Sequence, residues 1–192
     1  MAVDRTRDAL VVVDLQPDFM PDGALAVAEG DRIAAPIGQL ASRFSTVVAT
    51  QDWHPTGHVS FAERGGPWPP HCVAGSPGAE VHAALQDKLV TLKLRKGTHR
   101  DLDSYSAFYD DGGAPTGLAG YLRERGIERL FVCGLARDYC VRATALDGAR
   151  RAGFRVFVVD DLTRAVDPAS RAKVDREFAE AGVELVDSRA LS

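Results

Sequence analysis

The stretch that decides the fold is Ala9-Leu-Val-Val-Val13, which is followed directly by Asp14. It is short, rich in valine and free of polar alternation, which is typical of a strand buried on both faces of a parallel sheet. Parallel strands need a crossover connection, usually a helix, and such helices cover the sheet. The stretch therefore predicts an α/β protein in which strands and helices alternate.

Short apolar runs and helical patterns do alternate along the rest of the chain. Further strands are predicted at residues 46–50, 89–94, 130–133, 156–159 and 183–186. Helices are predicted at residues 33–44, 117–125, 141–152 and 168–181, with glycine caps after the last three. This order predicts one domain over residues 1–192, a three-layer α/β/α architecture around a six-stranded, mostly parallel sheet.

The composition of the 192 residues excludes several classes of protein. The chain is 45% hydrophobic and 26% charged, which is typical of a globular protein, and its net charge is −4. It has no basic face for nucleic acid and no polybasic run for a membrane surface. No stretch approaches the ~20 apolar residues of a membrane span. We therefore expect a cytoplasmic protein without nucleic-acid or membrane partners; its edge strands would allow a homo-oligomer.

Side chains capable of chemistry follow four of the predicted strands. Ligands of open α/β sheets bind beyond the carboxyl ends of the strands. The residues at these ends are Asp14, Asp52 with His54, Lys96 and, a few positions after its strand, Cys140. We therefore expect these side chains to meet at one edge of the sheet.

Cys140 is the expected nucleophile. It lies at the start of a predicted helix, where N–H groups and the helix dipole favour a thiolate and an adjacent oxyanion. Asp14 would take the thiol proton and pass it to a leaving amine, while Lys96 would hold both groups in their charged forms. The other cysteines, Cys72 and Cys133, are expected to be buried and inert.

A loop rich in proline, glycine and histidine carries a second group. Asp52 and His54 have the i, i+2 spacing that places both on one face of an extended segment, and His71 would return from the far end of the loop. One carboxylate and two imidazoles suit a divalent metal ion such as zinc, iron(II) or manganese. His58 and Glu63 are expected as outer contacts of this site.

The chain resembles the nicotinamidases, a family of the isochorismatase-like cysteine hydrolases, over residues 10–186. The motifs that carry the resemblance are Val13-Asp14-Leu-Gln-Pro-Asp-Phe19, Asp52-Trp-His54-Pro-x-Gly-His58, Trp68-Pro-Pro-His71-Cys72, Lys96-Gly97 and Gly134-Leu-Ala-Arg-Asp-Tyr-Cys140-Val. Trp-Pro-Pro-His-Cys placed after Asp-Trp-His is the most specific of them. The resemblance implies hydrolysis of nicotinamide, and of pyrazinamide, in NAD salvage, with one divalent metal ion.

The resemblance also implies residues around the nucleophile. It implies an oxyanion hole made by the backbone N–H groups of Ala136 and Cys140, beside a cis peptide bond between Leu135 and Ala136. It further implies a slot for the pyridine ring, with Phe19, Trp68 and Leu135 as the substrate-binding residues. These assignments rest on the resemblance and not on spacing.

Three other interpretations fit parts of the pattern. Another amidohydrolase of the superfamily, acting on a different small amide or carbamoyl substrate, would keep the triad but give the metal no ring nitrogen to bind. An iron oxygenase shares the two-histidine, one-carboxylate set but gives no role to Cys140 or Lys96. A ligand sensor without catalysis would be excluded by turnover. Arg137 has no role in any of these interpretations.

Overall fold

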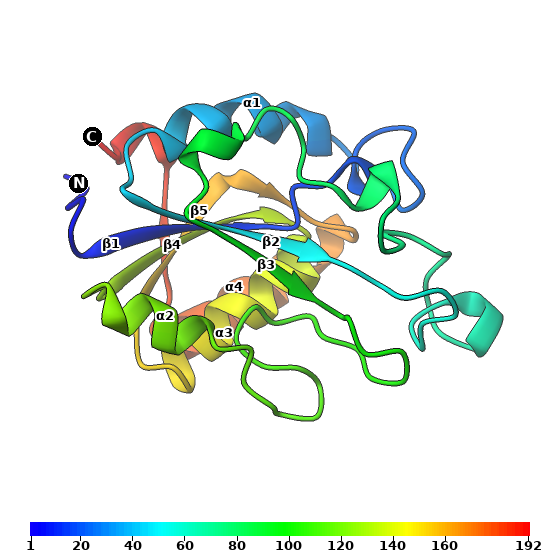
Figure 1. The fold of residues 1–192 in the computed structure, drawn as a ribbon. Coiled ribbons are helices and arrows are strands. Elements are labelled where there is room, and N and C mark those ends of the chain that lie inside the picture. The colour runs from blue at the N-terminus through cyan, green and yellow to red at the C-terminus, as the bar shows by residue number, and fades with distance from the viewer.

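The computed structural model describes residues 1–192, and a parallel sheet lies at its centre (Figure 1). The strands are β1 (Asp8–Val13), β2 (Thr46–Asp52), β3 (Leu92–Lys96), β4 (Arg129–Leu135), β5 (Arg155–Arg164) and β6 (Glu184–Val186). They lie in the order β3-β2-β1-β4-β5-β6, and every neighbouring pair is parallel. The predicted six-stranded α/β sheet is confirmed.

The valine-rich stretch forms the middle of this sheet. Every residue of β1 is buried, and Val12 lies opposite Ala49 of β2 and Cys133 of β4. The strand order reverses between β1 and β4, and a reversal of this kind opens a crevice at the carboxyl ends of the two strands. Asp14 follows β1 and Cys140 follows β4 shortly afterwards, so the topology brings both toward that crevice.

Helices cover both faces of the sheet and create two separate cores. Helix α1 (Gly30–Ala41) lies on one face, and α2 (Leu118–Glu124), α3 (Arg142–Arg150) and α4 (Arg171–Glu180) lie on the other (Figure 1). Alternate residues of β1 enter the two cores, Leu10 and Val12 on the α1 side and Val11 on the opposite side. Full burial of one such side chain contributes about 1.5–3 kcal/mol. The continuous apolar run is explained by burial on both faces.

Element boundaries differ from the prediction where a short turn precedes a regular element. The strand predicted at residues 89–94 begins at Leu92, because Asp87–Leu89 forms a 3-10 turn. The helix predicted at residues 141–152 begins at Arg142, because a π-helical turn, Arg137–Val141, precedes it. An apolar run identifies a buried segment but not its hydrogen-bond pattern, so these turns leave little trace in the sequence.

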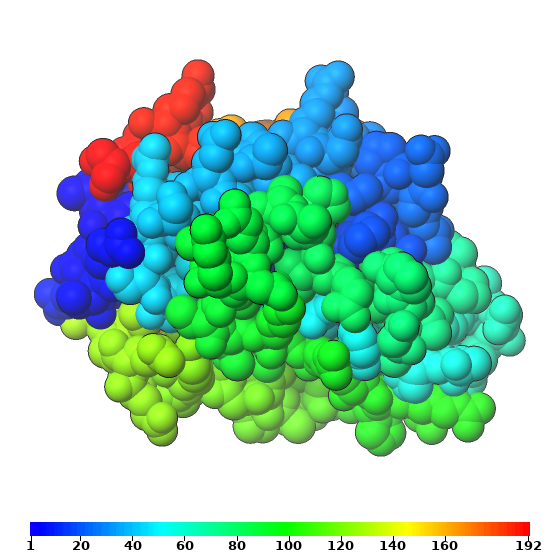
Figure 2. Space-filling view, turned by 45° about the horizontal axis from the view of Figure 1, so that its top comes forward, coloured from blue at the N-terminus to red at the C-terminus, as the bar shows by residue number.

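The chain termini and the long loops lie at opposite ends of the sheet. The termini are adjacent (Figure 2), and the backbone N–H of Val3 donates to the carbonyl of Ser192 at 2.9 Å. The loops that follow β2 and β3 extend beyond the carboxyl ends of these strands before the chain returns along the sheet (Figure 1). None of the helices combines the length and the apolar character needed to cross a bilayer. The loops therefore surround the edge at which the reactive side chains gather.

Candidate active site

Lys96 joins two buried carboxylates and a thiol. Its Nζ lies 2.9 Å from Asp14 Oδ2 and 3.3 Å from Cys140 Sγ, and it donates to Asp52 Oδ1 and to the carbonyl of Ser104. Burial favours the neutral amine, but the negative charges of Asp14 and Asp52 outweigh it and raise the pKa of Lys96 well above its usual value. The ammonium group is therefore a permanent positive charge inside the site.

Asp14 is fixed at the end of β1 by a partner on β2. It has a φ of 46°, and its backbone N–H donates to Thr50 Oγ1 at 3.0 Å. The same hydroxyl donates to Asp14 Oδ1 at 2.6 Å, which leaves Oδ2 to face Lys96. Burial raises the pKa of Asp14 although the charge of Lys96 acts in the opposite direction. A carboxylate with a raised pKa is a stronger base toward a thiol.

Cys140 lies in the π-helical turn between β4 and α3 and is 6% exposed. Burial raises the pKa of its thiol well above the usual value, although Lys96 favours the thiolate. A thiol with a raised pKa needs a base within reach in order to act as a nucleophile. One carboxylate oxygen each of Asp14 and Asp52 and the sulfur of Cys140 lie within 4.8 Å of one another. The Asp14 carboxylate is therefore close enough to take the proton of the Cys140 thiol.

The turn that carries Cys140 begins at a cis peptide bond between Leu135 and Ala136, where the resemblance placed one. Ala136 borders the cavity described below, and its backbone N–H donates to no atom of the protein. Its carbonyl accepts from the N–H groups of Tyr139 and Val141 and so closes the π-helical turn. The start of this turn therefore carries a backbone N–H without a protein acceptor, on a residue that borders the same cavity as Cys140.

Arg137 anchors the same turn to β5 and α4. Its guanidinium is 2.8 Å from Asp160 Oδ1 and 2.6 Å from Asp175 Oδ1, and it lies over the ring of Phe178. It also donates to Thr163 Oγ1 at 3.0 Å. The residue without a role in the sequence interpretation thus connects the turn that carries the nucleophile to the rest of the fold.

The other two cysteines are far less accessible than Cys140. Cys72 and Cys133 are free and fully buried, and burial raises the pKa of both thiols. The backbone N–H of Cys72 donates to Asp18 Oδ2 at 2.6 Å, which holds the end of the histidine-rich loop. Neither of these cysteines borders the cavity that Cys140 lines, and their inertness stays a prediction.

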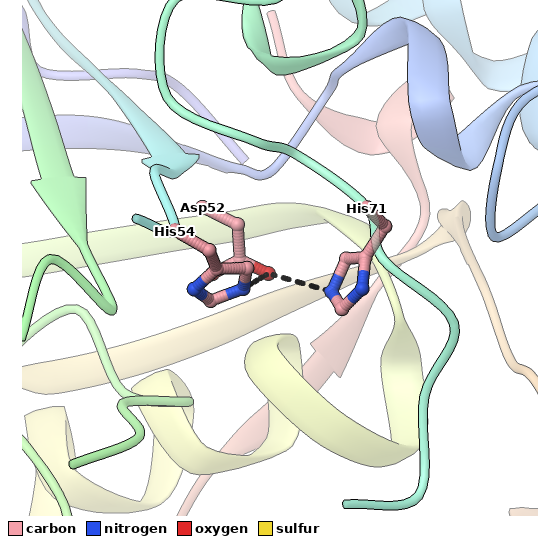
Figure 3. Close-up of side chains that lie close together, drawn as sticks. All are labelled: Asp52, His54 and His71. Atoms are coloured by element: carbon pink, nitrogen blue, oxygen red, sulfur yellow. Dashed lines mark ion pairs between the residues drawn. The ribbon is translucent and has the colours of Figure 1, made fainter. Parts of the chain in front are cut away.

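Asp52, His54 and His71 point toward one another (Figure 3). Asp52 Oδ2 lies 3.6 Å from His54 Nε2 and 4.0 Å from His71 Nε2. Burial opposes ionisation of Asp52, but the positive charge of Lys96 beside it outweighs this effect and lowers the pKa of Asp52. Donor atoms in a tetrahedral zinc site lie roughly 3.4 Å apart, so this spacing is close to that of a metal site.

The two imidazoles present their Nε2 lone pairs to this site. His54 Nδ1 is 3.0 Å from the carbonyl of Gly97, and His71 Nδ1 is 2.8 Å from the carbonyl of Pro69. A carbonyl only accepts hydrogen bonds, so Nδ1 carries the proton in both rings. Two lone pairs and one carboxylate oxygen converging in a buried space fit a divalent metal ion.

Two residues that the sequence interpretation did not include position these donors. Gly97 has a φ of +60°, and a Cβ there would lie 2.4 Å from the ring of His54. The Gln16 side chain donates to the carbonyl of Asp52 at 2.9 Å and accepts from its N–H at 2.8 Å. Both occur in the quoted motifs, but nothing in the sequence indicates a side chain that binds the backbone of another strand.

His58 lies behind His54 and not among the three donors. The two rings stack with their centroids 4.1 Å apart. His58 Nδ1 is 2.8 Å from Ser60 Oγ, and Nε2 is 3.2 Å from the carbonyl of Leu102. Because both nitrogens have protein partners, His58 acts on the donor set through the position of His54.

Glu63 and Leu135 are not where the sequence interpretation placed them. Glu63 is exposed on a 3-10 turn, Ala62–Arg64, and belongs to no group of converging donors. Leu135 is fully buried in the core on the α1 side and does not border the cavity. Neighbouring positions in a sequence do not determine side-chain direction, and the leucine at the end of β4 points into the core.

An apolar-walled cavity adjoins both groups of reactive residues. Trp68 Nε1 donates to the Tyr105 hydroxyl at 3.2 Å, and the Trp68 ring meets Tyr139 edge-on at 5.0 Å. Phe19 and Trp68 border the cavity, and Tyr105 and Tyr139 join them as aromatic residues that the sequence interpretation missed. The residues that border it are Phe19, Leu25, Val27, Asp52, Trp68, His71, Tyr105, Ala136, Tyr139, Cys140 and Val166.

Comparison with known proteins places the fold and this site in a family. Residues 8–190 match the model of the isochorismatase domain. The chain belongs to the isochorismatase family. Among relatives of this isochorismatase-family protein, the nicotinamidase of Acinetobacter baylyi is 45% identical over 94% of this chain and 92% of its own length.

Solved structures of similar proteins confirm the fold. The structure of PnC1 from L. infantum in complex with nicotinate has a TM-score of 0.97 and 48% identity, covering 100% of this chain and 98% of the other. The pyrazinamidase of Pyrococcus horikoshii in complex with zinc has a TM-score of 0.85 and 43% identity, covering 94% and 99%. A family resemblance stated from the motifs alone is thereby confirmed.

Proposed function

We propose that this isochorismatase-family protein is a nicotinamidase, which hydrolyses nicotinamide to nicotinate and ammonia in NAD salvage and also deamidates pyrazinamide. The position of Lys96 carries the proposal: its Nζ lies 3.3 Å from Cys140 Sγ and 2.9 Å from Asp14 Oδ2, beside a cavity with aromatic walls. A nucleophile, a base and a fixed cation this close together suit acyl transfer from an amide. The similarity to nicotinamidases and to a nicotinate complex supports this substrate.

The cavity suits a flat aromatic amide. Phe19 and Trp68 border it with their rings, and contacts between aromatic rings are worth about 0.5–1.5 kcal/mol beyond the buried area. Asp52, His71 and Cys140 border the same space, so a ring held there lies near both the donor set and the thiol. A ligand of this shape would place its carboxamide beside Cys140.

The donor set of Asp52, His54 and His71 would hold the divalent metal ion. Such an ion supplies a Lewis acid that binds and orients the nitrogen of the substrate ring. Zinc is the ion that two imidazoles and one carboxylate fit best, and iron(II) and manganese are further ions that these ligands accept. The similarity to a zinc-bound pyrazinamidase supports zinc.

Cys140 and Asp14 would carry out the first half of the reaction. Asp14 takes the thiol proton, and Sγ attacks the carboxamide carbon. Lys96 lowers the cost of separating the proton from the sulfur because its charge lies beside both groups. The N–H groups of Ala136 and Cys140 donate to the oxyanion, and one such donor is worth ~3 kcal/mol. Protonated Asp14 then gives its proton to the amide nitrogen, the carbon–nitrogen bond breaks, ammonia leaves, and a thioester on Cys140 remains.

Water completes the reaction with the same groups. Asp14 takes a proton from a water molecule, whose oxygen attacks the thioester carbon. The carbon–sulfur bond breaks, nicotinate leaves, and the proton on Asp14 returns to Cys140. One carboxylate thus serves as base and acid in both halves, which its raised pKa favours.

The test is ammonia release from nicotinamide before and after chelation, with metal analysis of the same sample. We expect steady release from the metal-loaded protein, loss of release when the metal is removed, and recovery when zinc is added back. Metal-loaded protein that releases no ammonia from nicotinamide would overturn the proposal. Release from another small amide or a carbamoyl compound in the same assay would then assign the alternative, an isochorismatase-like amidohydrolase of different specificity.

A further inference from the structure

Val166 is an exposed hydrophobic residue that also borders the buried cavity. It is 40% exposed, and every other residue of the cavity wall is buried or half-buried. It lies in the loop between β5 and α4. Val166 therefore stands between solvent and the place where we propose that the substrate ring binds.

Asp138 ties Val166 to the turn that carries the nucleophile. Asp138 Oδ1 accepts from the backbone N–H of Val166 at 2.9 Å, and Oδ2 accepts from the N–H of Asp167 at 2.9 Å. The hydroxyl of Ser170 also donates to Oδ2, at 3.4 Å. Asp138 belongs to the same π-helical turn as Cys140. One carboxylate thus fixes the outer wall of the cavity relative to the nucleophile.

A surface groove lies on the other side of this contact. Asp138, Asp167 and Ser170 border the groove, and Tyr105 and Tyr139 border both the groove and the cavity. Val166 of this loop borders the cavity, and Asp167 and Ser170 border the groove. Groove and cavity are therefore neighbours, and the loop is part of the partition between them.

The cavity is narrow, with about 30 Å³ open to the centres of water-sized atoms. Its walls therefore lie close to any ring that binds in it. The Val166 loop is the wall segment most open to solvent, and the neighbouring groove offers it space to move.

We propose that Asp138 is a positioning residue that latches Val166 over the mouth of the ring cavity, and that Val166 sets the largest ring the site accepts. That the bound ring is the pyridine ring of nicotinamide rests on the proposed function. Release of the latch lets the loop move toward the groove, which widens the cavity without touching Asp14, Lys96 or Cys140. The latch therefore governs the choice of substrate and its binding, and not the chemical step.

The first test compares nicotinamide with quinoline-3-carboxamide, which carries the same pyridine carboxamide and one additional fused benzene ring. In Val166→Ala, we expect the ratio of kcat/KM for the larger amide to that for nicotinamide to rise about tenfold, because two methyl groups are removed from the wall. In Asp138→Ala, the ratio rises in the same direction and KM for nicotinamide increases more than kcat falls. Asp138→Asn keeps one acceptor oxygen but sets its NH2 group against the other backbone N–H, so its ratio should lie between those of wild type and Asp138→Ala.

Asp187→Ala is the matched control, because Asp187 caps a different 3-10 turn by accepting from the N–H of Arg189 at 2.9 Å. We expect it to keep the wild-type ratio. An unchanged ratio in Val166→Ala would overturn the specificity role. A fall in kcat for both amides in Asp138→Ala, with the ratio and KM unchanged, would overturn the latch.

The second test does not depend on which amide is the substrate. Cys140 is the cysteine at the cavity, so its alkylation, followed by intact mass, reports access through the mouth. We expect the rate of Cys140 alkylation by N-ethylmaleimide, relative to the rate with the smaller iodoacetamide, to rise in Val166→Ala and in Asp138→Ala. Equal relative rates in wild type and both variants would contradict the proposal. Wild-type protein that leaves nicotinamide intact would overturn the proposed function, while the alkylation ratio would still decide the latch.

Discussion

The side chains placed for chemistry and the side chains around the ring cavity come from different kinds of segment. Asp14, Asp52 and Lys96 follow or end strands, and each is at most 5% exposed and held by buried partners. Trp68 and Val166 come from loops and are partly or largely exposed. Strand ends offer rigid positions, whereas loops adapt more easily. Changes at strand ends should therefore lower kcat and stability, and changes in the loops should alter KM and preference.

Lys96→Met should have the largest effect. It leaves Asp14 and Asp52 buried without their cation, so we expect a loss of about 3–5 kcal/mol in the free energy of unfolding. Ammonia release should fall at least ~10³-fold. Lys93→Met, on the same strand, is the control because its partner Asp87 is exposed, and it should stay within about 0.5 kcal/mol of wild type. Denaturant unfolding and the ammonia assay check both, and equal effects of the two variants would refute the role of burial.

His71→Ala sharpens the comparison, because His71 is the donor that a loop supplies. We expect metal affinity to fall more than about 100-fold, since one of three ligands is lost, whereas His58→Ala should cost about 10-fold by freeing the ring of His54. Metal content per chain after dialysis measures both. A larger loss in His58→Ala than in His71→Ala would mean that the metal lies on the His58 side.

Gly97→Ala tests how closely the third strand end approaches the donor set. Its Cβ would lie 2.4 Å from the His54 ring at a φ of +60°, so we expect a loss of about 1–3 kcal/mol in stability together with weaker metal binding. Gly120→Ala is the matched control, because that helical position is open, and it should raise stability by about 0.5–1 kcal/mol. Thermal unfolding with metal analysis separates the two, and two variants of equal stability would contradict the model of the site.

Trp68→Phe should have the smallest effect. It keeps an aromatic wall but removes the hydrogen bond to Tyr105, so we expect KM for nicotinamide to rise about two- to tenfold while kcat changes little. Steady-state kinetics measures the split. A fall in kcat without a change in KM would contradict the assignment of Trp68 to substrate binding, because that pattern is expected of the strand-end residues.

The sequence predicts the strand-end group well and the loop group poorly. Asp14, Lys96 and Cys140 could be brought together because parallel strands deliver their carboxyl ends to one edge of a sheet, whatever the loops do. Their support is invisible in the sequence, because Thr50 acts through a hydroxyl that points at Asp14 from the neighbouring strand. The π-helical form of the turn before α3 is equally hidden, since it changes hydrogen bonds and not polarity.

Loop residues follow no period, so their directions cannot be derived from spacing. Tyr139 and Val166 border the cavity, but nothing in their sequence context separates them from ordinary surface residues. Glu63 has the right chemistry for a metal ligand and yet is exposed on its turn. Apart from Phe19 and Trp68, which the family resemblance implied, the wall of the cavity had to come from the three-dimensional structure.

The most direct test of the central claim is ammonia release by Cys140→Ala, measured with its metal content. We expect no release from nicotinamide above background, a metal content per chain equal to that of wild type, and an unchanged fold, because a small residue replaces a small one. Substantial turnover by Cys140→Ala would contradict the thiol mechanism.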